Sequence, residues 1–325
     1  MAKVALRFAG LLLLAYGFLA AAQTAPNQST RSLLVNVLDR NGNAVRDLTK
    51  DGFRAKVNGR AAAIVEASYS LAPRRIVALL DMSGSMAGET EKNKKWQIAR
   101  EAVEDLLLGT PADVKLALLT FSSHVHDVFD FSQNRSSVGA WLKDLPRRRA
   151  EIKGTTALYD AVIAATKLLK PTRPGDAIYV ITDGGDNSSH ISETDTRKLL
   201  LQSGIRLFVF LFAEHSPFGS GAYDVMQLAR TTGGFVFGVA GHAPGALSLP
   251  SWDFEYEDDE HTRERIRLYT QALNIQVNGF YTLQLETPLQ PSKLRKVYLE
   301  IVDVRGQPRK DVAFTYSTLQ PPQPN

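Results

Sequence analysis

IVALLDMSGS, residues 76–85, is the stretch that decides the fold of this 325-residue chain. Its first five residues are continuously apolar, as expected of a β-strand that is buried on both faces. Strand-like and helix-like segments then alternate as far as residue 239. This alternation indicates an α/β fold with a doubly wound, mostly parallel sheet. The polar residues that end the stretch therefore stand just beyond the carboxyl end of a strand.

The periodicity of apolar residues predicts the individual elements of this α/β region. Helices are expected over residues 96–108, 136–145, 156–169, 193–203 and 224–231, and strands over 115–121, 125–131, 177–182, 205–212 and 235–239. The strand at 125–131 is expected to be an antiparallel edge strand.

Small β-rich segments flank the α/β region on both sides. We divide the chain into a signal peptide (1–22), a linker (23–30), a small β module (31–70), the α/β domain (71–245), a helix plus β-rich region (246–316) and a disordered tail (317–325). Whether the two β-rich flanks form one domain stays open.

The N-terminus is typical of a secretory signal peptide. Lys3 and Arg7 form a positive region, residues 11–19 are apolar and uncharged, and the small residues 20–22 precede Gln23. The apolar run is shorter than the roughly 18 residues that span a bilayer, although a retained anchor is the alternative. We therefore expect an exported protein, periplasmic or extracellular, with no integral membrane segment in the mature chain.

Charge and cysteine content exclude several functions. The net charge is +4, and loss of Lys3 and Arg7 with the signal peptide leaves 36 basic against 34 acidic residues. A protein that binds nucleic acid needs a concentrated basic face, so we expect no nucleic-acid partner. Cysteine is absent, which excludes disulfides, thiol catalysis and cysteine-ligated zinc.

Oxygen-bearing side chains are expected to meet at the carboxyl edge of the sheet, where open α/β sheets bind ligands. Asp81, Ser83 and Ser85 follow the first strand, Asp183 follows a later one, and GTTA at 154–157 precedes a helix. Carboxylates and hydroxyls without nitrogen or sulfur donors favour a hard cation such as Mg²⁺, Ca²⁺ or Mn²⁺. The alternative is that the two aspartates only cap the helices that follow them.

These residues resemble the motifs of von Willebrand factor type A (VWA) domains. DMSGS at 81–85 is similar to the family's DxSxS motif and follows an apolar strand, as the family requires. GTTALYD at 154–160 is similar to a GGTALYD-like form, which makes Thr156 the ligand and puts Thr155 where glycine is common. The choice between the two threonines stays open. Asp183 matches the third motif.

The resemblance, which covers about residues 71–245, implies a metal-ion-dependent adhesion site. Ser83, Ser85 and Thr156 would bind the ion directly, and Asp81 and Asp183 would act largely through water. A Glu or Asp of a partner protein would complete the octahedron, with Mg²⁺ as the expected ion and Ca²⁺ or Mn²⁺ as alternatives. The β-rich flanks resemble those of bacterial secreted "VWFA-related" proteins. This implies an exported, non-enzymatic module for adhesion or protein interaction.

Two other functions are alternatives to the adhesion or interaction module. Asp183 could be the general base of a metal-assisted hydrolase, or the chain could be a structural component of an envelope or secretion assembly with a vestigial metal site. His124 and His126 share a strand face, but no third zinc ligand is evident. The polar run 186–189 either shapes the ligand rim or forms a turn. The sequence does not predict the partner's identity or the oligomeric state.

Overall fold

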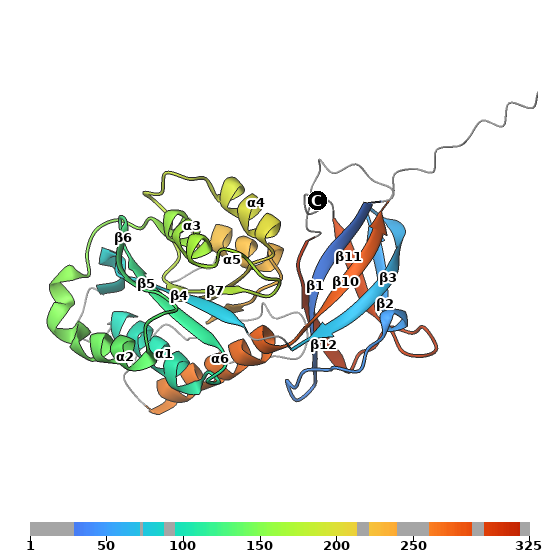
Figure 1. Ribbon diagram of the computed structural model, residues 1–325, viewed down its shortest axis with the longest axis horizontal. Coiled ribbons are helices and arrows are strands. Elements are labelled where there is room, and N and C mark those ends of the chain that lie inside the picture. The colour runs from blue at the N-terminus through green and yellow to red at the C-terminus, as the bar shows by residue number, and fades with distance from the viewer. Residues whose placement is uncertain are drawn as a thin grey trace, which may run out of the picture.

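The computed structural model describes residues 29–71, 74–87, 95–212, 221–238, 260–287 and 296–318. These residues form two six-stranded sheets, which stand side by side in Figure 1. The expected signal peptide, residues 23–28 of the linker and residues 319–325 of the tail lie outside the described residues. No helix in the part of the chain that the structure describes is long and apolar enough to cross a bilayer.

The first sheet is the α/β sheet that the sequence predicts. Its strands are β4 (Arg75–Asp81), β5 (Lys115–Phe121), β6 (Val125–Phe129), β7 (Ala177–Thr182), β8 (Arg206–Leu211) and β9 (Val236–Phe237). Their order is β6-β5-β4-β7-β8-β9, and all run parallel except β6, which pairs with β5 antiparallel at the edge. The predicted fold class and the antiparallel edge strand are both confirmed.

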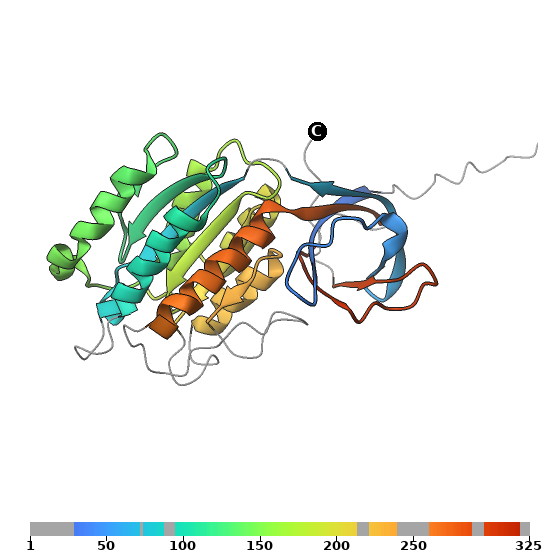
Figure 2. The same cartoon turned by 90° about the horizontal axis from the view of Figure 1, so that it is seen from below.

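Helices cover both faces of this sheet (Figures 1 and 2). On one face lie α1 (Lys95–Gly109), α2 (Arg135–Asp144) and α6 (Glu260–Asn278), and on the other α3 (Leu158–Leu168), α4 (Glu193–Ser203) and α5 (Ala222–Thr231). Short 3₁₀ helices occur at η1 (Lys50–Gly52), η2 (Gly84–Ala87) and η3 (Leu145–Glu151).

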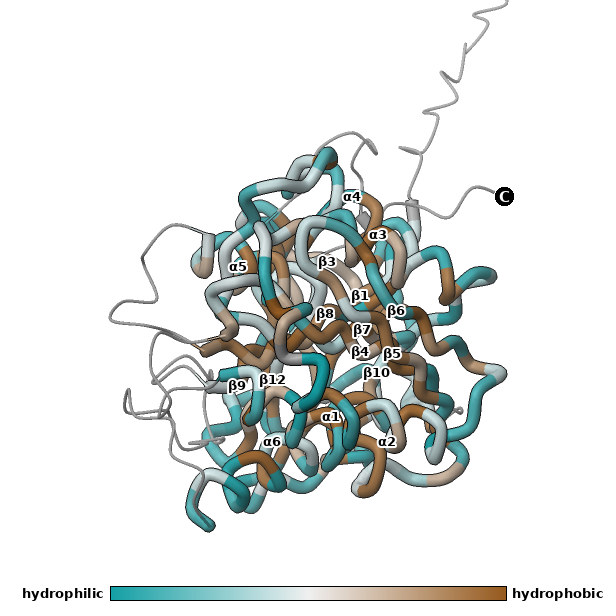
Figure 3. The backbone as a smooth tube through the Cα atoms, turned by 90° about the vertical axis from the view of Figure 1, so that its left-hand side faces the viewer, coloured by the Kyte–Doolittle hydropathy of each residue, from teal (hydrophilic) through white to brown (hydrophobic). Residues whose placement is uncertain are grey.

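Strand β4 shows why the central strands are continuously apolar. Ile76 and Leu80 join the core beneath α1 and α6, whereas Val77 and Leu79 join the core beneath α3 and α5. Both sets of side chains are buried because successive residues of a strand point to opposite faces. Figure 3 shows this concentration of apolar residues on the central strands. Polar residues are therefore left at the two ends of the strands, and these ends are the carboxyl edge and the amino edge of the sheet.

The second sheet is antiparallel and combines strands from both ends of the chain. It contains β1 (Ser29–Asp39), β2 (Phe53–Val57), β3 (Arg60–Ser70), β10 (Phe280–Thr287), β11 (Val297–Ile301) and β12 (Val312–Tyr316), in the order β11-β2-β3-β10-β1-β12. It curls around its own core, which includes Leu33, Phe53 and Leu283, as Figure 2 shows.

This pairing bears on a question that the sequence left open, whether the two β-rich flanks form one domain. The strands of residues 31–70 and 246–316 lie in one sheet, and α6, assigned to the second segment, packs on the α/β sheet instead. Apart from the local pair of β2 and β3, strand partners in this sheet are more than 200 residues apart, as in the pair Leu33↔Leu283. Hydrophobic patterns within each segment carry no information on such distant partners.

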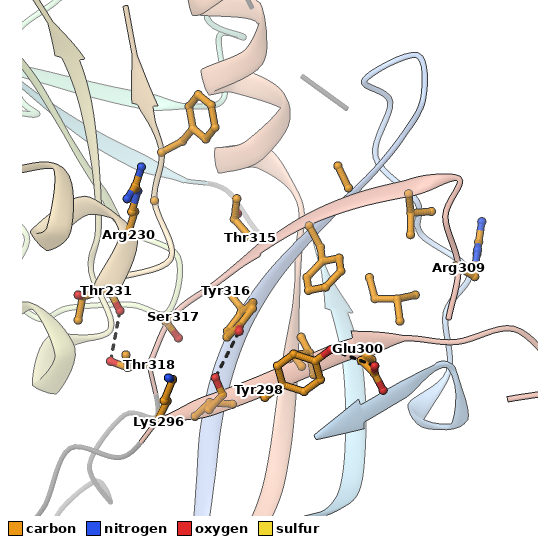
Figure 4. Close-up of a pocket in the computed structure, with 18 of the residues that line it drawn as sticks. Arg230, Thr231, Lys296, Tyr298, Glu300, Arg309, Thr315, Tyr316, Ser317 and Thr318 are labelled. Atoms are coloured by element: carbon orange, nitrogen blue, oxygen red, sulfur yellow. Dashed lines mark hydrogen bonds between the residues drawn. The ribbon is translucent and has the colours of Figure 1, made fainter. Parts of the chain in front are cut away.

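The α/β part of the chain is inserted between two neighbouring strands of the antiparallel sheet. The chain leaves that sheet at the end of β3 and returns at the start of β10, where Ser70 pairs directly with Phe280. A groove of about 930 Å³ lies between the outer strands β11 and β12 and residues 230–236. Figure 4 shows this groove. It is built from other residues than the metal site expected at the carboxyl edge.

Candidate metal centre

Asp81 is the last residue of β4 and the anchor of the turn that follows. Its side chain is 1% exposed. One carboxylate oxygen accepts a hydrogen bond from the backbone N–H of Ser83 at 2.8 Å, and the other accepts one from the Thr182 hydroxyl at 2.6 Å. Because Thr182 ends the neighbouring strand β7, these bonds fix the turn against the carboxyl edge of the sheet.

The two serine hydroxyls and the second aspartate form one connected set of oxygens. Ser83 Oγ lies 3.2 Å from Ser85 Oγ, and Ser85 Oγ donates to Asp183 Oδ1 at 3.0 Å. Asp183 directly follows β7, so residues 98 positions apart in the chain meet at one edge. The structure thus brings together four of the five residues proposed from the sequence.

The fifth residue, Thr156, lies on a loop that is bonded to the serine turn. The backbone N–H of Gly84 donates to the carbonyl of Gly154 at 3.0 Å. Thr156 is buried, with 4% of its surface exposed, whereas the neighbouring Thr155 is exposed. A buried side chain on this loop is the better candidate for a ligand, which favours Thr156 over Thr155.

The polar run 186–189 holds this threonine loop in place. The side-chain oxygen of Asn187 accepts from the backbone N–H of Thr156 at 2.8 Å, and Asp186 Oδ2 accepts from the N–H of Tyr159 at 3.0 Å. These N–H groups lie at the N-terminal end of α3, where no intrahelical partner is available. The run therefore caps α3 and supports the threonine loop. The sequence had left open whether it shapes the ligand rim or forms a turn.

Lys95, at the N-terminal end of α1, is a site residue that the sequence analysis missed. Its ammonium group lies 2.7 Å from Asp183 Oδ2, and the residue is 3% exposed. One signal was available, because Lys95 stands on the same helical stripe as the buried residues Ile98, Ala99 and Ala102. A lysine on an apolar stripe needs a partner, since a buried ammonium without one is costly.

The pKa of Asp81 reflects this crowded arrangement. Burial raises the pKa of Asp81 to about 6, and the nearby carboxylate of Asp183 adds to the rise. Hydrogen bonds from Thr182 and Ser83 act in the opposite direction. Two carboxylates that repel each other in a buried site can be stabilised by a shared cation.

The spacing of the oxygens fits a small dication. An octahedral Mg²⁺ binds oxygens at about 2.1 Å, so adjacent ligands stand about 3.0 Å apart. The separation of Ser83 Oγ from Ser85 Oγ is 3.2 Å. No group of three His, Asp or Glu side chains in the described part of the chain could hold a metal, so an ion at this edge would need hydroxyl ligands as well. The donor set therefore suits a hard cation.

The two histidines near this edge contact each other. The rings of His124 and His126 lie 4.2 Å apart between centroids, and His126 Nε2 is 2.6 Å from Ser122 Oγ. Burial lowers the pKa of His126, and the neighbouring His124 lowers it further. Their contact agrees with the expectation that they share a face of the strand.

A parallel sheet with hydroxyls and carboxylates gathered at its carboxyl edge defines a class of ligand-binding α/β domain. A family model described as von Willebrand factor type A domain matches residues 76–185, which include all five proposed ligands. The chain therefore carries a VWA domain. No curated protein sequence matches the chain.

Solved structures with a similar fold come from distant proteins. An aerotolerance-related membrane protein of Bacteroides fragilis is 17% identical, with 63% of this chain and 98% of that chain covered and a TM-score of 0.44. A von Willebrand factor type A protein of Catenulispora acidiphila is 12% identical, with coverages of 90% and 74% and a TM-score of 0.44. Proximal thread matrix protein 1 of the mussel byssus, with a zinc-occupied MIDAS (metal-ion-dependent adhesion site) motif, is 15% identical, with coverages of 68% and 50% and a TM-score of 0.43.

VWA domains are generally interaction modules, and they commonly bind a divalent cation at this kind of site. This chain spans half the length of the mussel protein, whose MIDAS motif is the one occupied by zinc.

Proposed function

We propose that this chain is an exported, metal-dependent protein-binding module that captures a carboxylate of a partner protein. The observation that carries the proposal is the hydrogen-bonded set of oxygens formed by Ser83, Ser85 and Asp183. The two serine oxygens, both proposed direct ligands, already lie 3.2 Å apart, close to the spacing of adjacent ligands around a six-coordinate dication. Little rearrangement is then needed when the ion binds.

The residues divide into two roles. Ser83, Ser85 and Thr156 would hold Mg²⁺ directly through neutral hydroxyls, and Asp81 and Asp183 would act largely through water. Neutral ligands leave most of the ion's charge uncompensated, so the bound ion supplies a Lewis acid for an external Glu or Asp side chain. Asp81 keeps the serine turn in position through its bond to the Ser83 N–H. This division favours capture of an acidic ligand.

Export rests on the sequence of residues 1–22, which lie outside the described residues. Their pattern of a positive region, an apolar run and small residues is the support for a periplasmic or extracellular location. Mass spectrometry of the mature protein tests this proposal. A mature chain that still begins at Met1 would contradict it.

A hydrolase with Asp183 as general base has less support. Both oxygens of this carboxylate are already engaged, one by Ser85 and the other by Lys95. A base that abstracts a proton from water needs an accessible oxygen within hydrogen-bonding distance of that water. Turnover of test esters or phosphoesters that requires Mg²⁺ and is lost in Asp183→Asn would favour the enzyme.

A matched pair of variants tests the metal site. Thr156→Ala removes the proposed ligand, whereas Thr155→Ala removes the same hydroxyl from the exposed neighbour. We expect calorimetric titration with MgCl₂ to show binding that is at least about tenfold weaker in Thr156→Ala and unchanged in Thr155→Ala. Unchanged binding in Thr156→Ala, or weaker binding in Thr155→Ala alone, would remove Thr156 from the site. Wild-type protein that binds no dication at millimolar concentration would indicate a vestigial site.

Partner capture is tested with the same pair. Immobilised wild-type protein and Thr155→Ala should retain a partner from an envelope extract with Mg²⁺ and release it in EDTA. Thr156→Ala should retain much less of that partner. A partner retained equally by all three proteins, with and without EDTA, would show that the metal site has no part in the interaction.

A further inference from the structure

Lys95 is buried beside the candidate metal site and bonded to one of its proposed ligands. The Lys95 Nζ atom lies 2.7 Å from Asp183 Oδ2, and the two side chains are 4% and 10% exposed. Lysine is almost never buried to this degree unless it is paired. The contact with Asp183 therefore compensates for the cost of burying this charge.

Asp183 connects this ammonium group to the hydroxyl ligands. Its Oδ2 accepts from Lys95, and its Oδ1 accepts from Ser85 at 3.0 Å. Ser85 in turn lies 3.2 Å from Ser83 through their hydroxyl oxygens. A single carboxylate thus joins a fixed positive charge to the place where a dication would be held.

The same ammonium group reduces the repulsion between the two aspartates. Asp81 is 1% exposed and is close enough to Asp183 for the two carboxylates to repel each other. Without a metal ion, the site would hold two buried negative charges and only neutral hydroxyls. Lys95 supplies one positive charge to this group of atoms.

We propose that Lys95 is a tethered counter-ion that stabilises the metal-free site and competes electrostatically with the dication, so that it sets the metal affinity. The proposal rests on the metal site of the proposed function. It follows from Coulomb's law that a charge which stabilises Asp183 in the absence of metal also repels a dication a few ångströms away. The site would accordingly bind a metal ion only where the ion is abundant, and would remain folded without it.

Replacement of Lys95 by methionine separates these two effects. Methionine keeps an unbranched chain of similar length, favours helices and tolerates burial. Lys95→Met should bind Mg²⁺ at least about tenfold more tightly at pH 7.5, because one positive charge near the ion is gone. In EDTA the variant should melt at a lower temperature than the wild type, since Asp183 loses its partner.

Two controls match this variant. Lys95→Arg keeps the charge and should bind Mg²⁺ within about threefold of the wild type. Lys167→Met removes an equal charge from an exposed lysine in the last turn of α3, the end opposite the Thr156 loop. It should change neither the Mg²⁺ affinity nor the melting temperature in EDTA. Lys95→Gln replaces the methionine variant if circular dichroism shows that the latter does not fold.

Calorimetric titration with MgCl₂ and melting curves in EDTA and in saturating Mg²⁺ give the answer. Tighter binding together with a lower melting temperature in EDTA supports the proposal. Unchanged or weaker binding by Lys95→Met, with a wild type that binds, would overturn it and leave the proposed function intact. Weaker binding would make Lys95 a residue that positions Asp183. Absence of binding in every protein would overturn both.

Discussion

The two edges of the α/β sheet hold buried charges in different ways. At the carboxyl edge, Asp183 is held by the side chains of Lys95 and Ser85. At the amino edge, the guanidinium of Arg206 is fully buried and donates to backbone carbonyls of Gln276 and Val277 at the end of α6. Side-chain partners can be exchanged for a bound ion, whereas backbone carbonyls of a packed helix cannot move away. The difference separates an edge suited to binding from an edge suited to permanent attachment.

Contacts with an aromatic ring further stabilise the buried charges at the amino edge. The Phe280 ring contacts two guanidinium groups, and the Cζ atoms of Arg74 and Arg206 each lie 4.5 Å from its centroid. Asn36 of the antiparallel sheet accepts from Arg206 at 2.7 Å and donates to Gln276 O at 2.8 Å. Burial and, to a smaller extent, the nearby charge of Arg74 together lower the pKa of Arg206 to about 9. The cation is therefore retained at neutral pH, with partners from the antiparallel sheet and from α6.

The largest expected effect comes from breaking the amino edge. Arg206→Met leaves the carbonyls of Gln276 and Val277 and the Asn36 side chain without this donor, and each buried unpaired group costs about 1–3 kcal/mol. We expect a loss of about 3–5 kcal/mol in the free energy of unfolding, measured by urea denaturation. Arg230→Met, which alters an exposed arginine, is the control and should change it by less than about 0.5 kcal/mol. A loss below about 1 kcal/mol in Arg206→Met would show that the hydrogen bonds of Arg206 do not stabilise the amino edge.

A smaller effect should appear at the carboxyl edge as pH changes. The pKa of Asp81 rises from 3.8 to about 6 on folding, so the folded chain binds this proton more strongly between these values. Stability contributed by the protonated carboxyl is present below about pH 4 and is lost as pH rises through about 6. In EDTA, the unfolding free energy of the wild type relative to Asp81→Asn should fall by about 2–3 kcal/mol between pH 4 and 7. A pH-independent difference would mean that Asp81 is not perturbed.

The smallest expected effect tests whether the two edges are independent. The seven residues of β4 separate them by about 20 Å at about 3.3 Å per residue. Sites this far apart usually contribute additively to stability. Saturating Mg²⁺ should therefore stabilise the wild type and Arg206→Met equally, within about 0.5 kcal/mol, by thermal unfolding. A larger difference would show that the edges are coupled.

The two edges also differed in how well the sequence predicted them. Asp81, Ser83 and Ser85 directly follow an apolar strand, and Asp183 follows another, so strand order alone brings their positions to one edge. Lys95 was missed because a lysine before Trp96 looks like any solvated residue at a helix start, although its stripe of apolar neighbours was a usable signal. Local patterns report what stands at a strand end, not which distant side chain is folded onto it.

The junction was less accessible to sequence reasoning. Arg206 lies within an apolar strand segment, and nothing near it in the sequence identifies Asn36 or Gln276 as partners. The antiparallel sheet was likewise divided into two segments, because its strands β1 and β10 are separated by most of the chain. The fold class was predicted because alternation of strands and helices is a local property. The pairing between distant segments depends on packing that only the folded chain brings about.

The direct pairing of Ser70 with Phe280 makes the α/β part of the chain an insertion within one hairpin of the antiparallel sheet. The residues between these two positions act as one very long hairpin loop, whose ends stand as close together as two neighbouring strands. Loop length adds little to the free-energy cost of closing such a hairpin. The antiparallel sheet can therefore close around an insertion of this size, and contacts such as the one between Arg206 and Asn36 then attach the inserted part to it.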